Sequence, residues 1–269
     1  MKLLIVRTRR PKRLLVLPKR ALAIPAALLC ICALCVLVTL PASVTSSAAD
    51  RQLPIYSVQR DGKMVSLTFD AAWGTEDTQT LIDILDRCHV KATFFVVGQW
   101  ADKYPESVKA LSDAGHEVMC HSDTHAHFNT LSAREIIDDV NACCGKIEAV
   151  TGTRPTLFRP PYGEYDDHVV TTLRAMGMEV IQWDVDSLDW KDYDAGTIAK
   201  RVTGRLAPGS IVLFHNAALH TPEALPAILE HLQQEGYEAV PVSKLLLPGE
   251  YGTDYTIDHT GRQHPAKER

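Results

Sequence analysis

Two histidines four residues apart, His121 and His125, follow a short apolar run at residues 118–120. A spacing of four lets a loop or a first helical turn bring both imidazoles to the same cation. Helical zinc proteases carry a general-base glutamate directly after the first histidine of such a pair, and Ser122 stands there in this chain. The pair therefore indicates a metal site whose base comes from elsewhere, unless both histidines are surface or capping residues.

Further polar residues with catalytic chemistry stand where apolar, strand-length runs end. These residues are Asp70, Arg159, Asp186, Asp189 and His215. In sheets built from β-α units, ligand and catalytic groups gather at the carboxyl ends of the strands. Any one of these residues could be a cap, a surface ion pair or a core histidine, but five in one sequential layout favour a single site at one edge of a sheet.

The elements that must position these residues alternate between strand-like and helix-like segments. Predicted strands cover residues 65–69, 92–97, 117–120, 156–158, 179–182, 210–213 and 239–241, and predicted helices cover residues 76–87, 105–114, 132–150, 166–176, 195–206 and 222–235. This alternation indicates an α/β fold with a parallel sheet and right-handed crossovers. Such strands over about 190 residues suit one closed or nearly closed barrel. The polar tail at 249–269 is expected to be disordered.

The amino-terminal forty residues predict membrane insertion. Residues 1–20 form a basic segment without an acid, and residues 21–40 are apolar and uncharged. A basic flank keeps the amino terminus in the cytoplasm, and about 20 apolar residues suffice to cross a bilayer. We expect a transmembrane anchor in the cell membrane, a linker at 41–60 and an extracytoplasmic domain at 61–248. The alternative is a signal core, with secretion after cleavage near Ala49.

Charge and cysteine usage narrow the partners. The net charge is −5, and subtracting the +8 of the first twenty residues leaves −13 on the remainder. Such an acidic domain lacks the basic patch that nucleic-acid phosphates require, whereas a neutral or amine-bearing glycan is easily accommodated. The cysteines after residue 50 are Cys88, Cys120, Cys143 and Cys144, without zinc-ribbon spacing. Buried free thiols are expected, and a Cys88–Cys120 link is left open.

The polar clusters form five short motifs at residues 68–70, 121–125, 159–163, 186–190 and 213–215. In this order they resemble the five motifs of the polysaccharide deacetylases, carbohydrate esterase family 4, over roughly residues 60–246. The run Thr-Phe-Asp-Ala-Ala-Trp-Gly at 68–74 is most similar to the spore-associated, PdaB-like branch. The resemblance implies a distorted (β/α) barrel of about seven parallel strands and hydrolysis of an N-acetyl group on an amino sugar.

The resemblance also implies roles for the polar residues. His121 and His125 would bind a divalent metal, zinc or alternatively cobalt or nickel, which polarises the amide carbonyl and acidifies a bound water. Asp70 would be the base that takes the proton from that water, and Arg159 would keep Asp70 ionised. His215 would be the acid that protonates the departing amine.

Other residues of the same motifs would support this chemistry. Asp189 would orient His215 and raise its pKa. The backbone N–H of Tyr162, after a stiff Pro-Pro turn, would face the developing oxyanion. Contacts with the substrate are expected from Pro161, Trp190 and Leu213, with ordinary core packing as the alternative for the last two.

One position departs from the family pattern. Most members carry a second acid directly after the base, as the third metal ligand, and this chain has Ala71 there. Asp77 is the main candidate for a replacement ligand, and Asp123 is a second one. The remaining histidines, His127 among them, are expected to be surface or structural residues.

Two functions of different classes follow. The first is a metal-dependent N-deacetylase acting on peptidoglycan or a related N-acetylated glycan, and the retained base and acid at Asp70 and His215 favour it. The second is a catalytically silent glycan-binding or envelope-assembly protein, which Ala71 favours. Hydrolysis of another amide or ester on the same scaffold is a third reading, because a fold does not fix the substrate.

Overall fold

The computed structural model describes residues 51–266. The predicted basic segment at 1–20 and the predicted anchor or signal core at 21–40 lie outside the described residues. Among the helices within 51–266, none is both long enough and apolar enough to cross a membrane.

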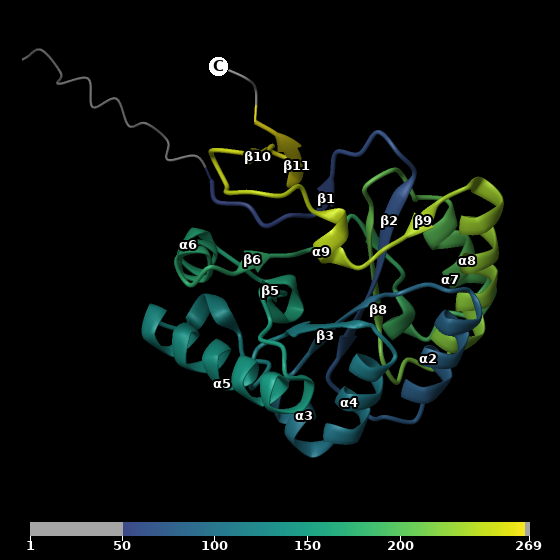
Figure 1. Cartoon of the computed structure of the whole chain (residues 1–269), viewed down its shortest axis with the longest axis horizontal. Helices are drawn as coiled ribbons and strands as arrows, with labels where there is room; N and C mark the ends of the chain where they lie inside the picture. The colour runs from purple at the N-terminus through teal and green to yellow at the C-terminus, as the bar shows by residue number, and fades with distance from the viewer. Residues whose placement is uncertain (1–50, 267–269) are drawn as a thin grey trace, which may run out of the picture. The chain divides into compact units, whose positions relative to one another are not determined.

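A curled parallel sheet forms the centre of the described part (Figure 1). Its hydrogen-bonded order is β6-β5-β4-β3-β2-β8-β7, and a short strand β9 also pairs with β2. The strands are β2 (Met64–Ala71), β3 (Thr93–Val96), β4 (Glu117–Cys120), β5 (Leu157–Phe158), β6 (Glu179–Val180), β7 (Val185–Asp186), β8 (Ile211–His215) and β9 (Glu238–Ala239). The α/β class and the parallel sheet are confirmed. The ladder ends at β6 and β7, so the sheet is a curled half-barrel and is more open than the closed or nearly closed barrel that the strand count suggested.

Helices connect consecutive strands and cover one face of the sheet, which buries their apolar sides. They are α2 (Thr78–Arg87), α3 (Gly98–Lys103), α4 (Pro105–Asp113), α5 (Ala133–Thr151), α6 (Asp167–Ala175), α7 (Ala195–Thr203), α8 (Thr221–Glu235) and α9 (Val242–Leu245), with short 3₁₀ turns η1 (Phe128–Thr130), η2 (Pro161–Gly163) and η3 (Asp189–Lys191). The longest helix, α5, starts with a capping box between Ser132 and Glu135 and ends at Gly152, whose φ of 72° suits glycine. The short α3 and α9 were not predicted, because six and four residues are too few to show a helical period.

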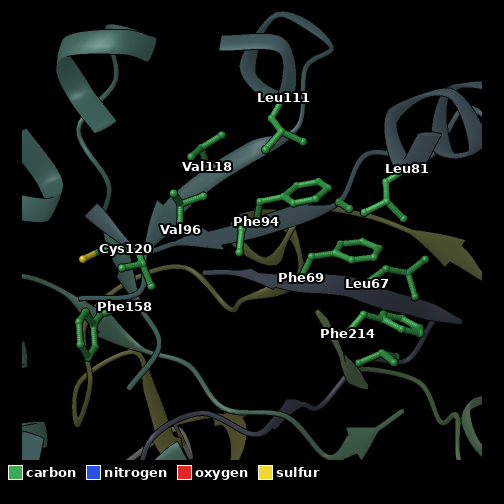
Figure 2. Packing of buried hydrophobic residues seen from close by; sticks show 14 of the residues in the cluster. Leu67, Phe69, Leu81, Phe94, Val96, Leu111, Val118, Cys120, Phe158 and Phe214 are labelled. Carbon is green, nitrogen blue, oxygen red and sulfur yellow. The ribbon is translucent and has the colours of Figure 1, made fainter. Parts of the chain in front are cut away.

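Alternation along β2 decides which side chains face the helices and which face the concave side. Leu67 and Phe69 pack into the helix-side core, where Phe69 stacks between Phe94 and Phe214 with ring centroids 4.8 and 5.3 Å apart (Figure 2). The alternate residues are polar, and Thr68 donates to the carbonyl of Val212 at 2.6 Å. The last of these alternate residues is Asp70, which therefore reaches the cavity at the carboxyl end of the strand.

The carboxyl-terminal tail corrects one prediction. Residues 249–266 are not a disordered tail, because β10 (Tyr255–Ile257) pairs antiparallel with β11 (Arg262–Pro265). β11 pairs in turn with β1 (Ser57–Val58), so the predicted linker at 41–60 is also wrong for its last residues. Tyr255 explains the order: its side chain is 1% exposed, and its hydroxyl donates to Glu179 Oε1 at 2.5 Å. The buried ring of Tyr255 and the backbone hydrogen bonds between β10 and β11 keep this segment folded although its composition is polar.

Candidate active site

The carboxyl ends of the parallel strands surround a cavity of about 430 Å³. Seven of the predicted site residues line it, namely Asp70, His121, His125, Tyr162, Trp190, Leu213 and His215. Asp186 also lines the cavity, and its Oδ1 accepts the N–H of Leu188 at 2.8 Å. The structure thus brings most of the predicted site residues together in one cavity at this edge of the sheet.

Arg159 and Asp70 form a buried ion pair at the floor of the cavity. Arg159 is fully buried, and its Nη1 donates to Asp70 Oδ1 at 2.8 Å. Its guanidinium also lies over the ring of Phe95, 4.2 Å from the centroid, which fixes the plane of the fork. Burial alone would raise the pKa of Asp70, but the charge of Arg159 and its hydrogen bond prevail and lower it. Asp70 is therefore an ionised carboxylate, as a general base requires.

His121 presents one nitrogen to the same carboxylate. Its Nδ1 lies 2.8 Å from the carbonyl oxygen of Arg159, which can only accept, so Nδ1 carries the proton. Burial lowers the pKa of His121 more strongly than Asp70 raises it, so the ring is neutral. Its Nε2 lone pair faces Asp70 Oδ2 at 3.5 Å. Since Nε2 of His121 carries no proton, its lone pair is available to a cation, and the Asp70 carboxylate lies next to that position.

His125 lies beside His121 because the intervening loop is tightly turned. Ser122 and His125 both have left-handed backbone conformations, with φ of 65° and 55°, and Ser122 Oγ accepts the N–H of His125 at 2.7 Å. The two imidazole centroids are 5.0 Å apart. Burial, followed by the neighbouring His121, lowers the pKa of His125 to about 4, so this ring is also neutral near pH 7. Both rings are thus in the protonation state that binds metals.

The donor set consists of the two neutral imidazoles of His121 and His125, and it fits a divalent cation that keeps other positions for water or substrate. Within residues 51–266 no three His, Cys, Asp or Glu side chains form a ready-made metal cluster. Asp77 does not supply the third ligand: it lies outside the cavity lining, and its Oδ2 accepts the N–H of Ala217 at 2.8 Å. Ala71 is 1% exposed and packs into the helix-side core.

His215 and Asp189 form the second charged pair of the site. His215 Nδ1 lies 2.8 Å from Asp189 Oδ1, which leaves Nε2 as the free ring nitrogen. Asp189 is fully buried, and its Oδ2 also accepts from the His215 N–H and from Thr221 Oγ1, both at 2.7 Å. Burial lowers the pKa of His215, but the hydrogen bond and the charge of Asp189 outweigh it, so the pKa is raised. The contact is the one that the predicted orienting role of Asp189 requires.

Tyr162 lies at the lip of the cavity in a left-handed conformation, with φ of 59°. Its ring contacts His125 edge-on, with centroids 4.5 Å apart, and stacks on His127 at 4.4 Å. His127 Nδ1 pairs with Glu164 Oε2 at 2.9 Å, so this histidine braces the lip and is more than a surface residue. Pro161 is buried and does not line the cavity, which does not support its predicted contact with substrate.

Sequence reasoning missed Trp73 and Asn216. The Trp73 ring is 56% exposed, lines the cavity and lies 6.1 and 6.2 Å from the rings of His125 and His215. Asn216 holds the loop that carries it, because its Oδ1 accepts the N–H of Ala72 at 3.1 Å and its Nδ2 donates to the carbonyl of Gly74 at 2.9 Å. Asn216 directly follows β8 and Trp73 comes two residues after β2, and these positions could have identified both.

The chain is similar to proteins of known class over most of the described residues. The profile of the polysaccharide deacetylases matches residues 57–181. The peptidoglycan-N-acetylmuramic acid deacetylase PdaC of Bacillus subtilis is 35% identical over 189 residues, which are 70% of this chain and 40% of that protein. The peptidoglycan-N-acetylglucosamine deacetylase PgdA of Listeria monocytogenes is 35% identical over 211 residues, 76% of this chain and 44% of that one. The chain thus spans less than half the length of these two relatives.

A solved structure with a similar fold adds a contrast. BA3943 of Bacillus anthracis, described as a CE4-family pseudoenzyme, superposes with a TM-score of 0.70 at 37% identity over 72% of this chain and 69% of that one. A mutant of BA3943 with restored enzymatic activity superposes with a TM-score of 0.69 at 38% identity, over 72% of this chain and 71% of that one. With the motifs gathered in one cavity and these matches over the same residues, the chain belongs to the polysaccharide deacetylase family.

Proposed function

We propose that the chain is a metal-dependent hydrolase that removes N-acetyl groups from amino sugars of peptidoglycan or a related extracytoplasmic glycan. One observation carries the proposal: an ionised carboxylate and a histidine with a raised pKa line the same cavity as two neutral imidazoles. A protein that only binds glycan requires neither a positioned base nor a positioned acid.

The residues supply the proton transfers of amide hydrolysis. When bound by His121 and His125, the metal would polarise the acetyl carbonyl and acidify a water molecule. Asp70 accepts the proton of the attacking water, and its pair with Arg159 keeps it ionised for that purpose. His215 Nε2 donates a proton to the amine nitrogen as the carbon–nitrogen bond breaks, which releases acetate and the free amino sugar. The backbone N–H of Tyr162 stabilises the negative charge that develops on the carbonyl oxygen.

The surroundings of the cavity suit a glycan. Three exposed aromatic side chains, Trp73, Tyr162 and Trp190, line the cavity, and sugar rings stack on aromatic faces. The two named relatives act on peptidoglycan by their names. Zinc is the proposed metal, with cobalt or nickel as alternatives, because imidazole ligands suit all three.

The apolar segment at 21–40 supports a location of the domain outside the membrane, on the same side as the proposed substrate. We propose location at the cell membrane with the catalytic domain outside, or secretion after cleavage near Ala49. The spore-associated, PdaB-like assignment remains a prediction from residues 68–74.

A catalytically silent glycan-binding or envelope-assembly protein is the second candidate. Ala71 favours it, since no acid among the described residues replaces the missing ligand, and the pseudoenzyme BA3943 shows the same fold. Fewer protein ligands should weaken metal binding.

Acetate release decides between the two candidates. Purified full-length chain would be incubated with N-acetylglucosamine oligomers and with peptidoglycan, in the presence of zinc, cobalt or nickel. The deacetylase function predicts acetate release that falls about 100-fold or more in His215→Ala. Metal-independent binding to peptidoglycan without any acetate would favour the silent protein.

A further inference from the structure

A second cavity adjoins the active-site cavity and has no part in the chemistry described above. Its volume is about 370 Å³, and it shares Ala72, Trp73 and His125 with the first cavity. Its remaining wall includes Gln99 and Lys103 from α3. The three shared residues make the second cavity a direct neighbour of the first, on the side where Trp73 and His125 lie.

The wall of this second cavity is fixed by hydrogen bonds. Trp100 is 3% exposed, and its Nε1 donates to the carbonyls of Trp73 and Gly74 at 2.8 Å. The backbone N–H of Gln99 donates to the carbonyl of Asp123 at 3.0 Å, which ties α3 to the loop between the two histidines. The cavity is therefore part of the same framework as the catalytic residues.

The two cavities differ in charge. Aspartates 70 and 186 line the first, where Asp70 is paired with the buried Arg159, whereas the second is lined by Lys103 and by no acid. Within residues 51–266 Lys103 makes no ion pair, and its ammonium lies 4.9 Å from the centroid of its neighbour Tyr104. Asp102 beside it is already paired with Lys146 at 2.8 Å.

Glu76 is the other acid near Lys103, and its Oε2 accepts the N–H of Thr75 at 2.9 Å. The strongest interaction of Lys103 is with the side chain of Tyr104, and no carboxylate of the described residues lies within ion-pair distance of its ammonium. An anionic substituent would be attracted to this ammonium in the second cavity.

We propose that the second cavity binds the carboxylate of an acidic substituent on the sugar being deacetylated, with Lys103 as its cation. The chain would then prefer a carboxylate-bearing N-acetyl amino sugar, such as N-acetylmuramic acid, to the neutral N-acetylglucosamine. Sequence similarity does not distinguish between the two sugars, because the relative named for each sugar is 35% identical to the chain. The inference rests on the proposed deacetylase function.

The test compares Lys103→Gln and Lys103→Glu with the matched control Lys109→Gln. Lys109 lies on α4, lines neither cavity and pairs with Asp113 at 2.7 Å, so its replacement removes one surface charge elsewhere. Acetate release by the full-length chain would be followed on two tetrasaccharides, one with N-acetylmuramic acid and no stem peptide, the other of N-acetylglucosamine alone.

We expect Lys103→Gln to raise KM for the acidic tetrasaccharide about 10-fold and Lys103→Glu to raise it further. The kcat for the acidic tetrasaccharide, and both kcat and KM for the neutral one, should be unchanged. Lys103 variants that match Lys109→Gln on both tetrasaccharides would overturn the inference.

A binding measurement separates failure of the inference from failure of the proposed function. If the wild-type chain releases no acetate from either tetrasaccharide, the deacetylase function is wrong for these sugars. Calorimetric titration of the same two tetrasaccharides then decides the inference alone. Weaker binding of the acidic one to Lys103→Glu than to Lys109→Gln supports it, and equal binding overturns it.

Discussion

Replacing Asp189 by asparagine should shift the pH dependence of turnover, because Asp189 sets the protonation state of His215. Burial lowers the pKa of His215, and the hydrogen bond and charge of Asp189, 2.8 Å from Nδ1, raise it above its ordinary value. A general acid must be protonated, so activity is lost as the pH rises through this pKa. Without the carboxylate the effect of burial remains, and the alkaline limb of the profile should move to lower pH.

The size of the effect follows from the role of the pair. A positioned acid contributes about 100-fold to 10,000-fold, so Asp189→Asn should lower kcat at neutral pH by about 100-fold or more. The assay is acetate release between about pH 5 and about pH 10, with thermal unfolding as the folding control. Asp186→Asn removes a more distant charge, which contributes least of the groups acting on His215, and should shift the limb less. If the alkaline limb of the pH profile stayed in place in Asp189→Asn, Asp189 would not be the group that raises the pKa of His215.

Three other substitutions test separate parts of the account. Asp70→Asn should lower turnover about 100-fold or more while metal content is retained, and loss of metal would show that Asp70 is a ligand instead of the base. His125→Ala should weaken metal affinity about 10-fold or more, measured by competition with a chelator, and an unchanged affinity would remove His125 from the site. Tyr255→Ala should destabilise the chain by about 3 to 5 kcal/mol in denaturant unfolding, against about 1 kcal/mol for Tyr255→Phe, and equal effects would contradict the packing role of its ring.

The layout of the site was predictable because its residues lie at the ends of strands. Asp70 and His215 close apolar runs in the sequence, and in parallel strands those ends meet at one edge of the sheet. The ion pair between Arg159 and Asp70, 89 residues apart in the chain, followed from the same reasoning together with the family motifs. Helix positions were predictable where periodicity ran over nine or more residues, as in α5 and α8.

The missed features depend on contacts that leave no periodic signal. The hydrogen bonds of Asn216 to a loop 144 residues earlier follow from the pairing of β2 with β8, which no local pattern shows. Order in the last segment depends on one aromatic side chain, Tyr255, within a polar stretch. The stacking of His127 on Tyr162 joins two loops from neighbouring strands, and residue 127 lies beyond the end of β4, where no strand or helix period applies.

The most direct test of the central claim is the metal dependence of acetate release. Full-length chain would be stripped with a chelator, assayed on peptidoglycan, and assayed again after stoichiometric zinc is added. The account predicts no acetate from the stripped chain and recovery with about one zinc per chain bound by His121 and His125. Acetate release that persists without metal, or a chain that binds zinc yet releases no acetate from any N-acetylated glycan, would contradict it.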